Sequence, residues 1–199
     1  PSTIIPPWFS EGSAQYMAAS AQHDTWDSHR DMILRQAVLN DDLLTFEEMS
    51  VFGAKSGLGF EKVYDHGYSL CLHIVNQYGE GALRDILRAM TPGWRFDFNS
   101  AIESVLGIPG QTLYDQWKAA LVERYQIQQS SRIDRLSEGD LVFDNGYMNL
   151  HPRWSPDGDR IAFLTNEASD YTRTALMVYT PEDSTKKSAG PACAVELDD

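Results

Sequence analysis

The spacing of apolar residues changes near residue 130, and this change limits the folds open to the chain. Before it, apolar residues recur at helical spacing. The clearest stripe recurs every fourth residue, at Leu113, Trp117, Leu121 and Tyr125. After residue 130, short β-type runs alternate with turn signals. The pattern predicts an α+β chain, with a mainly α-helical domain at residues 1–129 and a small antiparallel β unit within residues 130–199.

Helix boundaries are suggested by polar residues placed just before the apolar periodic stretches. Ser10 and Asp24 occupy such positions, and we expect each of them to cap a helix. Further helices are expected over residues 60–78, 81–90 and 100–106.

The second part of the chain has the runs and turns of an antiparallel meander. Strands are expected at Leu141–Phe143, Arg160–Leu164 and Ala175–Tyr179. The sequence from Pro156 to Asp159 predicts a tight turn before the second run. A polar linker is expected between residues 126 and 135, and a polar tail from residue 181 onward.

Composition excludes several classes of function. The formal net charge of −13 opposes binding to nucleic acid and to anionic membrane surfaces. No segment approaches the roughly 20 apolar residues that span a bilayer. Cys71 lies among apolar residues and is expected to be buried, and two cysteines, Cys71 and Cys193, do not settle the redox compartment.

A first motif lies near the beginning of the chain. The segment from Pro7 to Tyr16 has the sequence PWFSEGSAQY. It resembles the Trp-x-x-Glu-Gly helix of gluzincin metallopeptidases, the aminopeptidase-N and thermolysin-like group. In that family the glutamate is the third protein ligand of a catalytic zinc ion, and the resemblance assigns this role to Glu11.

A second motif follows later in the helical part. Tyr64-Asp65-His66-Gly67 resembles the Tyr-x-x-Gly segment of the aminopeptidase-N-like members. There the tyrosine hydroxyl stabilises the oxyanion of the tetrahedral intermediate, and the resemblance implies this catalytic role for Tyr64. Taken one at a time, both residues have simpler explanations. Glu11 could be a solvated carboxylate in the first turn of a helix, and Tyr64 a core tyrosine with a satisfied hydroxyl.

The HExxH motif, which supplies two histidine ligands and the general base in that family, is absent from these 199 residues. In the family it precedes the glutamate, and this chain begins shortly before Glu11. We therefore expect a fragment of a larger protein that is not a working peptidase by itself, with zinc belonging to the parent protein. His66 and His73 lie seven residues apart and could share a helix face, but such a pair is more often structural than metal-binding.

A third motif lies in the β part. The segment from His151 to Phe163 has the sequence HPRWSPDGDRIAF, which resembles the blade repeat of Tol-type β-propellers. The resemblance implies that Trp154 packs between blades. A closed propeller needs about four to eight blades, and one copy of the repeat is found here, so we expect the first blade of a longer propeller.

The expected function is that of a fragment of a zinc-dependent peptidase-like protein with a C-terminal propeller, acting on peptides or proteins. One alternative is a non-catalytic scaffold that binds peptides or proteins. Another is an unrelated helical interaction domain, which a wide separation of Glu11 and Tyr64 would favour. The resemblance to Tol-type proteins suggests a periplasmic or secreted location. Apolar surface left open in a fragment predicts self-association.

Overall fold

The chain forms two compact units, Pro1–Leu136 and Ser137–Asp199. The computed structural model describes residues 5–53, 55, 57–90, 97–130, 132–135, 137, 139–146, 148–167, 173–181 and 194–196, with backbone alone for 134 and 194–196. Cys193 and most of the expected polar tail lie outside these residues. The boundary expected near residue 130 coincides with the end of the last long helix, and the contacts divide a short way beyond it.

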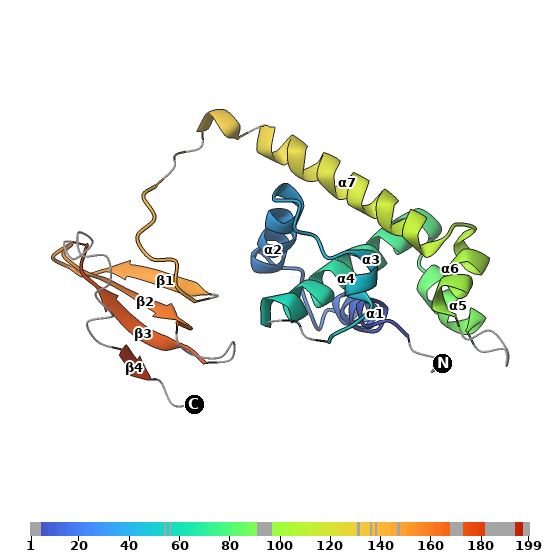
Figure 1. The fold of residues 1–199 in the computed structure, drawn as a ribbon, viewed down its shortest axis with the longest axis horizontal. Helices are drawn as coiled ribbons and strands as arrows, with labels where there is room; N and C mark the ends of the chain where they lie inside the picture. The colour runs from blue at the N-terminus through green and yellow to red at the C-terminus, as the bar shows by residue number, and fades with distance from the viewer. Residues whose placement is uncertain are drawn as a thin grey trace. The chain divides into compact units, whose positions relative to one another are not determined.

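The first unit is helical. Its elements in chain order are α1 (Pro7–Ser20), α2 (Ser28–Leu39), α3 (Phe46–Met49), α4 (Gly57–Tyr78), α5 (Ala82–Ala89), α6 (Phe98–Leu106), α7 (Gly110–Ser130) and the 3₁₀ turn η1 (Ile133–Arg135). Helix α4 is central and contacts α1, α2, α3, α5 and α7, with its closest packing against α1 (Figure 1). Together with the antiparallel sheet of the second unit, these helices confirm the α+β prediction.

The prediction that Ser10 caps the first helix is wrong. Helix α1 begins at Pro7, with Pro6 as its N-cap residue. Proline is well suited to this first position, because its fixed backbone angle matches the helix and it has no N–H to satisfy. Ser10 lies inside the first turn, and its hydroxyl donates a hydrogen bond of 3.1 Å to the Pro7 carbonyl. The earlier start places Glu11 beyond the first turn.

The prediction that Asp24 caps the second helix is also wrong. The N-cap of α2 is Asp27, whose carboxylate accepts hydrogen bonds from the backbone N–H groups of His29 and Arg30. Asp24 instead forms an ion pair of 2.8 Å with the Arg30 guanidinium. Both aspartates precede the apolar stretch, but Asp27 directly precedes the first helical residue, Ser28.

The core of the helical unit is built largely from aromatic side chains. The Trp8 ring meets the rings of Phe9, Phe46 and Phe98 at centroid distances of 5.4, 5.8 and 5.8 Å. The stripe predicted on α7 is buried against this core, at Leu113, Trp117, Leu121 and Tyr125. Cys71 is buried, as its apolar neighbours in the sequence predict.

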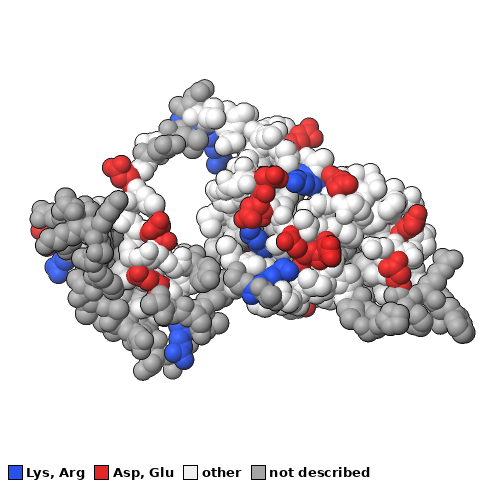
Figure 2. Space-filling view, in the orientation of Figure 1, with Lys and Arg blue, Asp and Glu red and all other residues white. Residues whose placement is uncertain are grey.

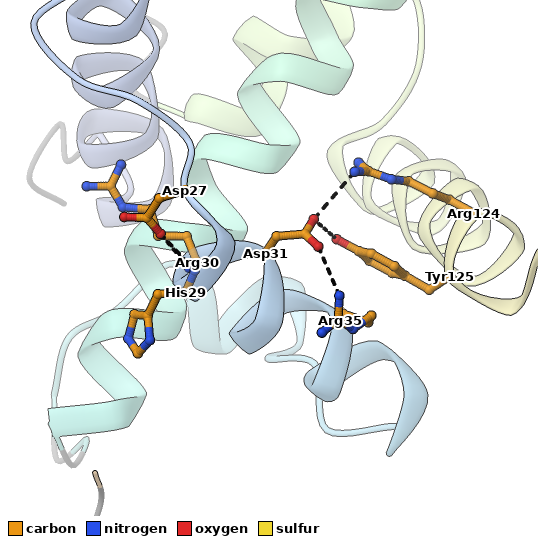
Figure 3. A network of polar contacts seen from close by, with 7 residues as sticks. All are labelled: Asp27, His29, Arg30, Asp31, Arg35, Arg124 and Tyr125. Atoms are coloured by element: carbon orange, nitrogen blue, oxygen red, sulfur yellow. Dashed lines mark hydrogen bonds and ion pairs between the residues drawn. The ribbon is translucent and has the colours of Figure 1, made fainter. Parts of the chain in front are cut away.

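Helices α2 and α7 are joined by a polar network around Asp31 (Figure 3). One carboxylate oxygen accepts a hydrogen bond of 2.9 Å from the Tyr125 hydroxyl, and it lies 3.4 Å from the Arg124 guanidinium. The other oxygen pairs with Arg35 at 3.3 Å. Tyr125 is fully buried, and this burial, together with the bond to Asp31, raises the pKa of its hydroxyl.

Replacing Asp31 with alanine is expected to lower the free energy of unfolding by about 1–3 kcal/mol, because a buried hydroxyl would lose its acceptor. Urea unfolding followed by circular dichroism measures the change. Arg35→Ala is the matched control, and it removes a half-exposed ion pair worth about 1 kcal/mol at most. The double variant Asp31→Ala/Tyr125→Phe should recover part of the loss. Equal effects of the two single variants would contradict this account of the network.

The second unit is an antiparallel sheet with strand order β1-β2-β3-β4. Its strands are β1 (Asn149–Trp154), β2 (Ile161–Thr165), β3 (Ala175–Tyr179) and β4 (Ala194–Glu196). Residues Leu141–Phe143, which were expected to form a strand, do not form one. Phe143 packs against the sheet, with its ring 5.0 Å from that of Phe163. Leu141 and Val142 are 78% and 51% exposed.

The predicted turn lies between β1 and β2. The Gly158 N–H donates to the Ser155 carbonyl at 2.9 Å, and Gly158 has a φ of +79°, which favours glycine. The Asp157 carboxylate accepts hydrogen bonds from the Ser155 hydroxyl and from the Asp159 N–H. Trp154, just before the turn, is 62% exposed. The blade motif therefore folds as a strand–turn–strand unit with its tryptophan on the surface.

Charge is distributed over the surface of the helical unit. On the face shown in Figure 2, carboxylates are spread widely, and the basic side chains lie among them. Among the helices of the described residues, none has the length and apolar character needed to cross a membrane.

Candidate functional site

The crossing of α1 and α4 brings the two helical motifs together. A Cβ atom added to Gly12 would lie 2.2 Å from the carbonyl carbon of Gly67, and one added to Gly67 would lie 2.3 Å from the Trp8 carbonyl oxygen. Real Cβ atoms essentially never approach so closely. The glycine of each motif is therefore the residue that lets the two backbones touch.

Glu11 and Tyr64 meet beside this crossing. Glu11 directly precedes Gly12, and Tyr64 lies one turn before Gly67. The contact between the two glycines therefore brings the two side chains together. The Glu11 carboxylate lies near enough to the Tyr64 hydroxyl to act on its ionisation. Partial burial raises the pKa of Tyr64 above its ordinary value, and the nearby Glu11 carboxylate raises it further. The structure thus joins the two residues that the sequence singles out.

The geometry bears on the two simpler explanations, a solvated first-turn carboxylate for Glu11 and a core tyrosine for Tyr64. Glu11 is not a first-turn carboxylate, since α1 has no acidic residue in its first turn. Tyr64 is not a fully buried core tyrosine, because its side chain keeps some exposure and lies near the Glu11 carboxylate. The wide separation that would have favoured an unrelated helical domain is not found.

Asp65 is the unusual residue of the same segment. Its side chain is fully buried, and neither carboxylate oxygen has a hydrogen-bond partner among the residues that the structure describes. Burial and, to a smaller extent, the nearby charge of Glu61 raise the pKa of this carboxyl to about 7, while the charge of Arg30 opposes the shift. Arg30 is not a partner for Asp65, because its guanidinium is held by Asp24 and by the Thr25 carbonyl.

The histidines of α4 are structural in this unit. His66 is fully buried with its imidazole ring 6.0 Å from the Trp117 ring, and burial lowers its pKa to about 3. A buried neutral imidazole in this position is a core group. Burial also lowers the pKa of His73, which is half-buried. The two side chains are not brought together with a carboxylate or thiol to make a metal site within the described part of the chain.

The residues present do not amount to a zinc site. A catalytic zinc ion takes three protein ligands and keeps one open position. Within the described ranges, no group of three histidine, cysteine, aspartate or glutamate side chains is placed to hold a metal ion. Glu11 is oriented toward a tyrosine hydroxyl and could contribute one ligand of three.

The β unit contains a separate cavity of about 230 Å³. Its lining is mainly apolar and includes Leu141, Val142, Phe143, Pro152, Ile161, Phe163 and Tyr179. Asp140 and Asn149 supply polar groups at its wall. The cavity lies between residues 140–143 and the sheet, and within the described residues its lining contains no group of three side chains placed to hold a metal ion.

Comparison of the chain with models of known protein families, with curated proteins and with solved structures finds no match in any of the three. The function is therefore inferred from the geometry of Glu11, Tyr64 and the residues around them.

Sequence reasoning missed most of those surroundings. Phe60, Tyr64 and Tyr68 recur every fourth residue on α4, and this spacing could have indicated a shared aromatic face. Phe52 and Trp26 join the same face from other segments, through ring contacts with Phe60 and Tyr68. No pattern in the sequence indicates these two contacts.

Proposed function

We propose that the helical unit is the glutamate-and-tyrosine half of a gluzincin-type zinc peptidase site, and that the β unit is the first blade of a Tol-type propeller. The observation that supports the first part is the proximity of Glu11 to Tyr64, set by two glycines that belong to the same two motifs. Two motifs quoted from the sequence thus meet at one point of the fold.

The roles follow from the chemistry of the two side chains. Glu11 contributes one carboxylate ligand, while the two histidines and the general base come from outside these residues. Bound zinc supplies a Lewis acid that polarises a peptide carbonyl. Tyr64 supplies a neutral hydroxyl donor, because a tyrosine is protonated at neutral pH, as a donor to a developing oxyanion must be. The chain by itself remains an incomplete site.

The proposal is tested by zinc binding and hydrolysis. The 199-residue chain is expected to bind zinc weakly and without defined stoichiometry. A form extended upstream of Pro1 is expected to contain HExxH and to bind one zinc ion per chain. In that form Glu11→Gln should weaken zinc binding at least tenfold. Tyr64→Phe should leave zinc binding unchanged and slow peptide hydrolysis by about 10²–10³. Glu123→Gln, on the exposed face of α7, is the matched control.

A non-catalytic scaffold is the second candidate, and the lack of three metal-binding side chains among the described residues favours it. An upstream sequence without HExxH, or zinc binding that is insensitive to Glu11→Gln, would support the scaffold and contradict the peptidase proposal. Both candidates have peptides or proteins as partners, and a periplasmic or exported location suits both. Self-association of the isolated chain is part of the proposal, and a strictly monomeric chain at high concentration would contradict that part.

A further inference from the structure

The connection between α3 and α4 places one aromatic ring against Tyr64. The ring is that of Phe52, whose centroid lies 6.0 Å from the Tyr64 centroid, with 36° between the two ring planes. The same ring lies 5.5 Å from the ring of Phe60, which is one turn before Tyr64 on α4. Phe52 therefore packs across one turn of α4 from a segment outside that helix.

Phe52 faces the helix while its neighbours in the chain face solvent. Val51 is 51% exposed and Gly53 is exposed, whereas Phe52 is half-buried. The Lys55 ammonium donates a hydrogen bond of 2.8 Å to the Val51 carbonyl, and this bond spans Phe52. On the other side of the ring, the fully buried Met49 anchors the end of α3. The ring is thus carried by a segment that is tied down in both directions along the chain.

Tyr64 occupies a position where such a contact affects its orientation. It is half-buried, and a side chain on a partly exposed helix face exchanges between rotamers unless its neighbours pack against it. The Glu11 carboxylate lies near the hydroxyl, and the Phe52 ring lies against the tyrosine ring. The carboxylate can interact with the hydroxyl, whereas the apolar ring restricts the motion of the tyrosine ring.

The position of the hydroxyl decides whether it can stabilise an oxyanion. A donor has to lie about 2.7–3.1 Å from the oxygen on which charge develops. A misplacement of about 1 Å can slow a reaction by about 10². Because the hydroxyl is the outermost atom of the side chain, a rotation about the Cα–Cβ bond moves it farther than any ring atom. Restricting the ring therefore restricts the hydroxyl.

We propose that Phe52 is a positioning residue for the Tyr64 hydroxyl. Its ring packs against the tyrosine ring and keeps the hydroxyl beside Glu11, so that Phe52 acts on the reaction through Tyr64 and touches neither substrate nor metal. The inference rests on the proposed function, in which Tyr64 donates to the oxyanion. It adds a third segment, the connection between α3 and α4, to a site that the two motifs place on α1 and α4.

The first test uses the 199-residue chain with ¹³C-labelled tyrosine and follows the titration of Tyr64 by NMR, with Tyr64→Phe to identify its signal. Burial is the main cause of the raised pKa of Tyr64, and the Glu11 carboxylate adds to it. Phe52→Ala exposes the tyrosine ring and releases the hydroxyl. It is therefore expected to lower the pKa of Tyr64 toward the ordinary value of 10.0. An unchanged pKa would overturn the proposal.

Three further variants of the connection serve as controls. Phe52→Leu keeps most of the apolar volume and should keep most of the rise in the pKa of Tyr64. Phe52→Val replaces the alanine variant if circular dichroism shows that Phe52→Ala does not fold. Val51→Ala removes an exposed apolar side chain from the same connection and should leave the pKa of Tyr64 unchanged. A pKa that Val51→Ala lowers as much as Phe52→Ala does would also overturn the proposal.

The second test measures peptide hydrolysis by the form extended upstream of Pro1. Phe52→Ala is expected to lower kcat by about 10–100-fold, and to leave KM and zinc stoichiometry unchanged. In a Tyr64→Phe background the same substitution should cause no further loss of kcat, because the hydroxyl that it positions is gone. Equal losses of kcat in the two backgrounds would show that Phe52 acts through another group, and would overturn the proposal.

The two tests separate this inference from the proposed function. If Phe52→Ala lowers the pKa of Tyr64 but the extended form does not hydrolyse peptides, the coupling of the two rings is supported and the proposed function alone is contradicted. Hydrolysis that depends on Tyr64 and not on Phe52 would contradict this inference alone.

Discussion

Gly12→Ala is expected to lower the free energy of unfolding by about 3 kcal/mol or more. The added methyl group would lie 2.2 Å from the Gly67 carbonyl carbon and 2.3 Å from its oxygen. Both are backbone atoms, so no side-chain rotation relieves the clash. Helices α1 and α4 would have to separate, and the buried rings of Trp8 and Phe9 would lose part of their packing.

Urea unfolding of the purified variant measures this effect. Gly53→Ala is the matched control, because an added Cβ atom there meets nothing within 4 Å. The control is expected to change the free energy of unfolding by less than about 1 kcal/mol. Similar stabilities for the two variants would show that the crossing is not as close as described. They would also remove the geometric basis for the contact between Glu11 and Tyr64.

Asp65→Asn is expected to stabilise the protein above neutral pH by roughly 2–4 kcal/mol. The pKa of the buried carboxyl is about 7, against an ordinary value of 3.8, so between these values the folded state holds a proton that the unfolded state releases. Stability from this group is therefore fully present below about pH 4, and it is lost as pH rises to about 7. Above pH 7 the folded protein contains a buried, unpaired charge. The neutral amide avoids that charge.

The measurement is the free energy of unfolding of both proteins at pH 5 and pH 8.5. The gain from Asp65→Asn should be larger at pH 8.5, because the native side chain is ionised in the folded state there. Asp115→Asn, an exposed position on α7, is the matched control and should have little effect at either pH. A gain that is equal at both pH values, or a loss at pH 8.5, would contradict the account of Asp65.

Much of the fold follows from local patterns. The period of four on α7 predicts a buried stripe, and Leu113, Trp117 and Tyr125 are all buried. The Ser-Pro-Asp-Gly sequence predicts the turn between β1 and β2, because its residues make their hydrogen bonds with one another. Local spacing is sufficient in these cases, since the interacting atoms are close in the chain.

Local patterns were insufficient where more than one contact was open to the same residue. Asp24 and Asp27 both precede α2, and Asp27 caps the helix while Asp24 pairs with Arg30 in its first turn. Leu141–Phe143 has the composition of a strand, but Phe143 packs on the sheet through Phe163 instead of pairing with it. In this second case the outcome depends on a partner elsewhere in the fold.

The sequence by itself determined the two classes of structure, the change between them near residue 130, and the identity of Glu11 and Tyr64 as a pair to examine. Only the tertiary structure decided that Gly12 and Gly67 touch, that Glu11 lies near Tyr64, and that Asp65 is buried without a hydrogen-bond partner among the described residues. The reason is physical: periodicity is set by neighbours in the chain, whereas close backbone approach, burial and pairing are set by residues that become neighbours only when the helices cross.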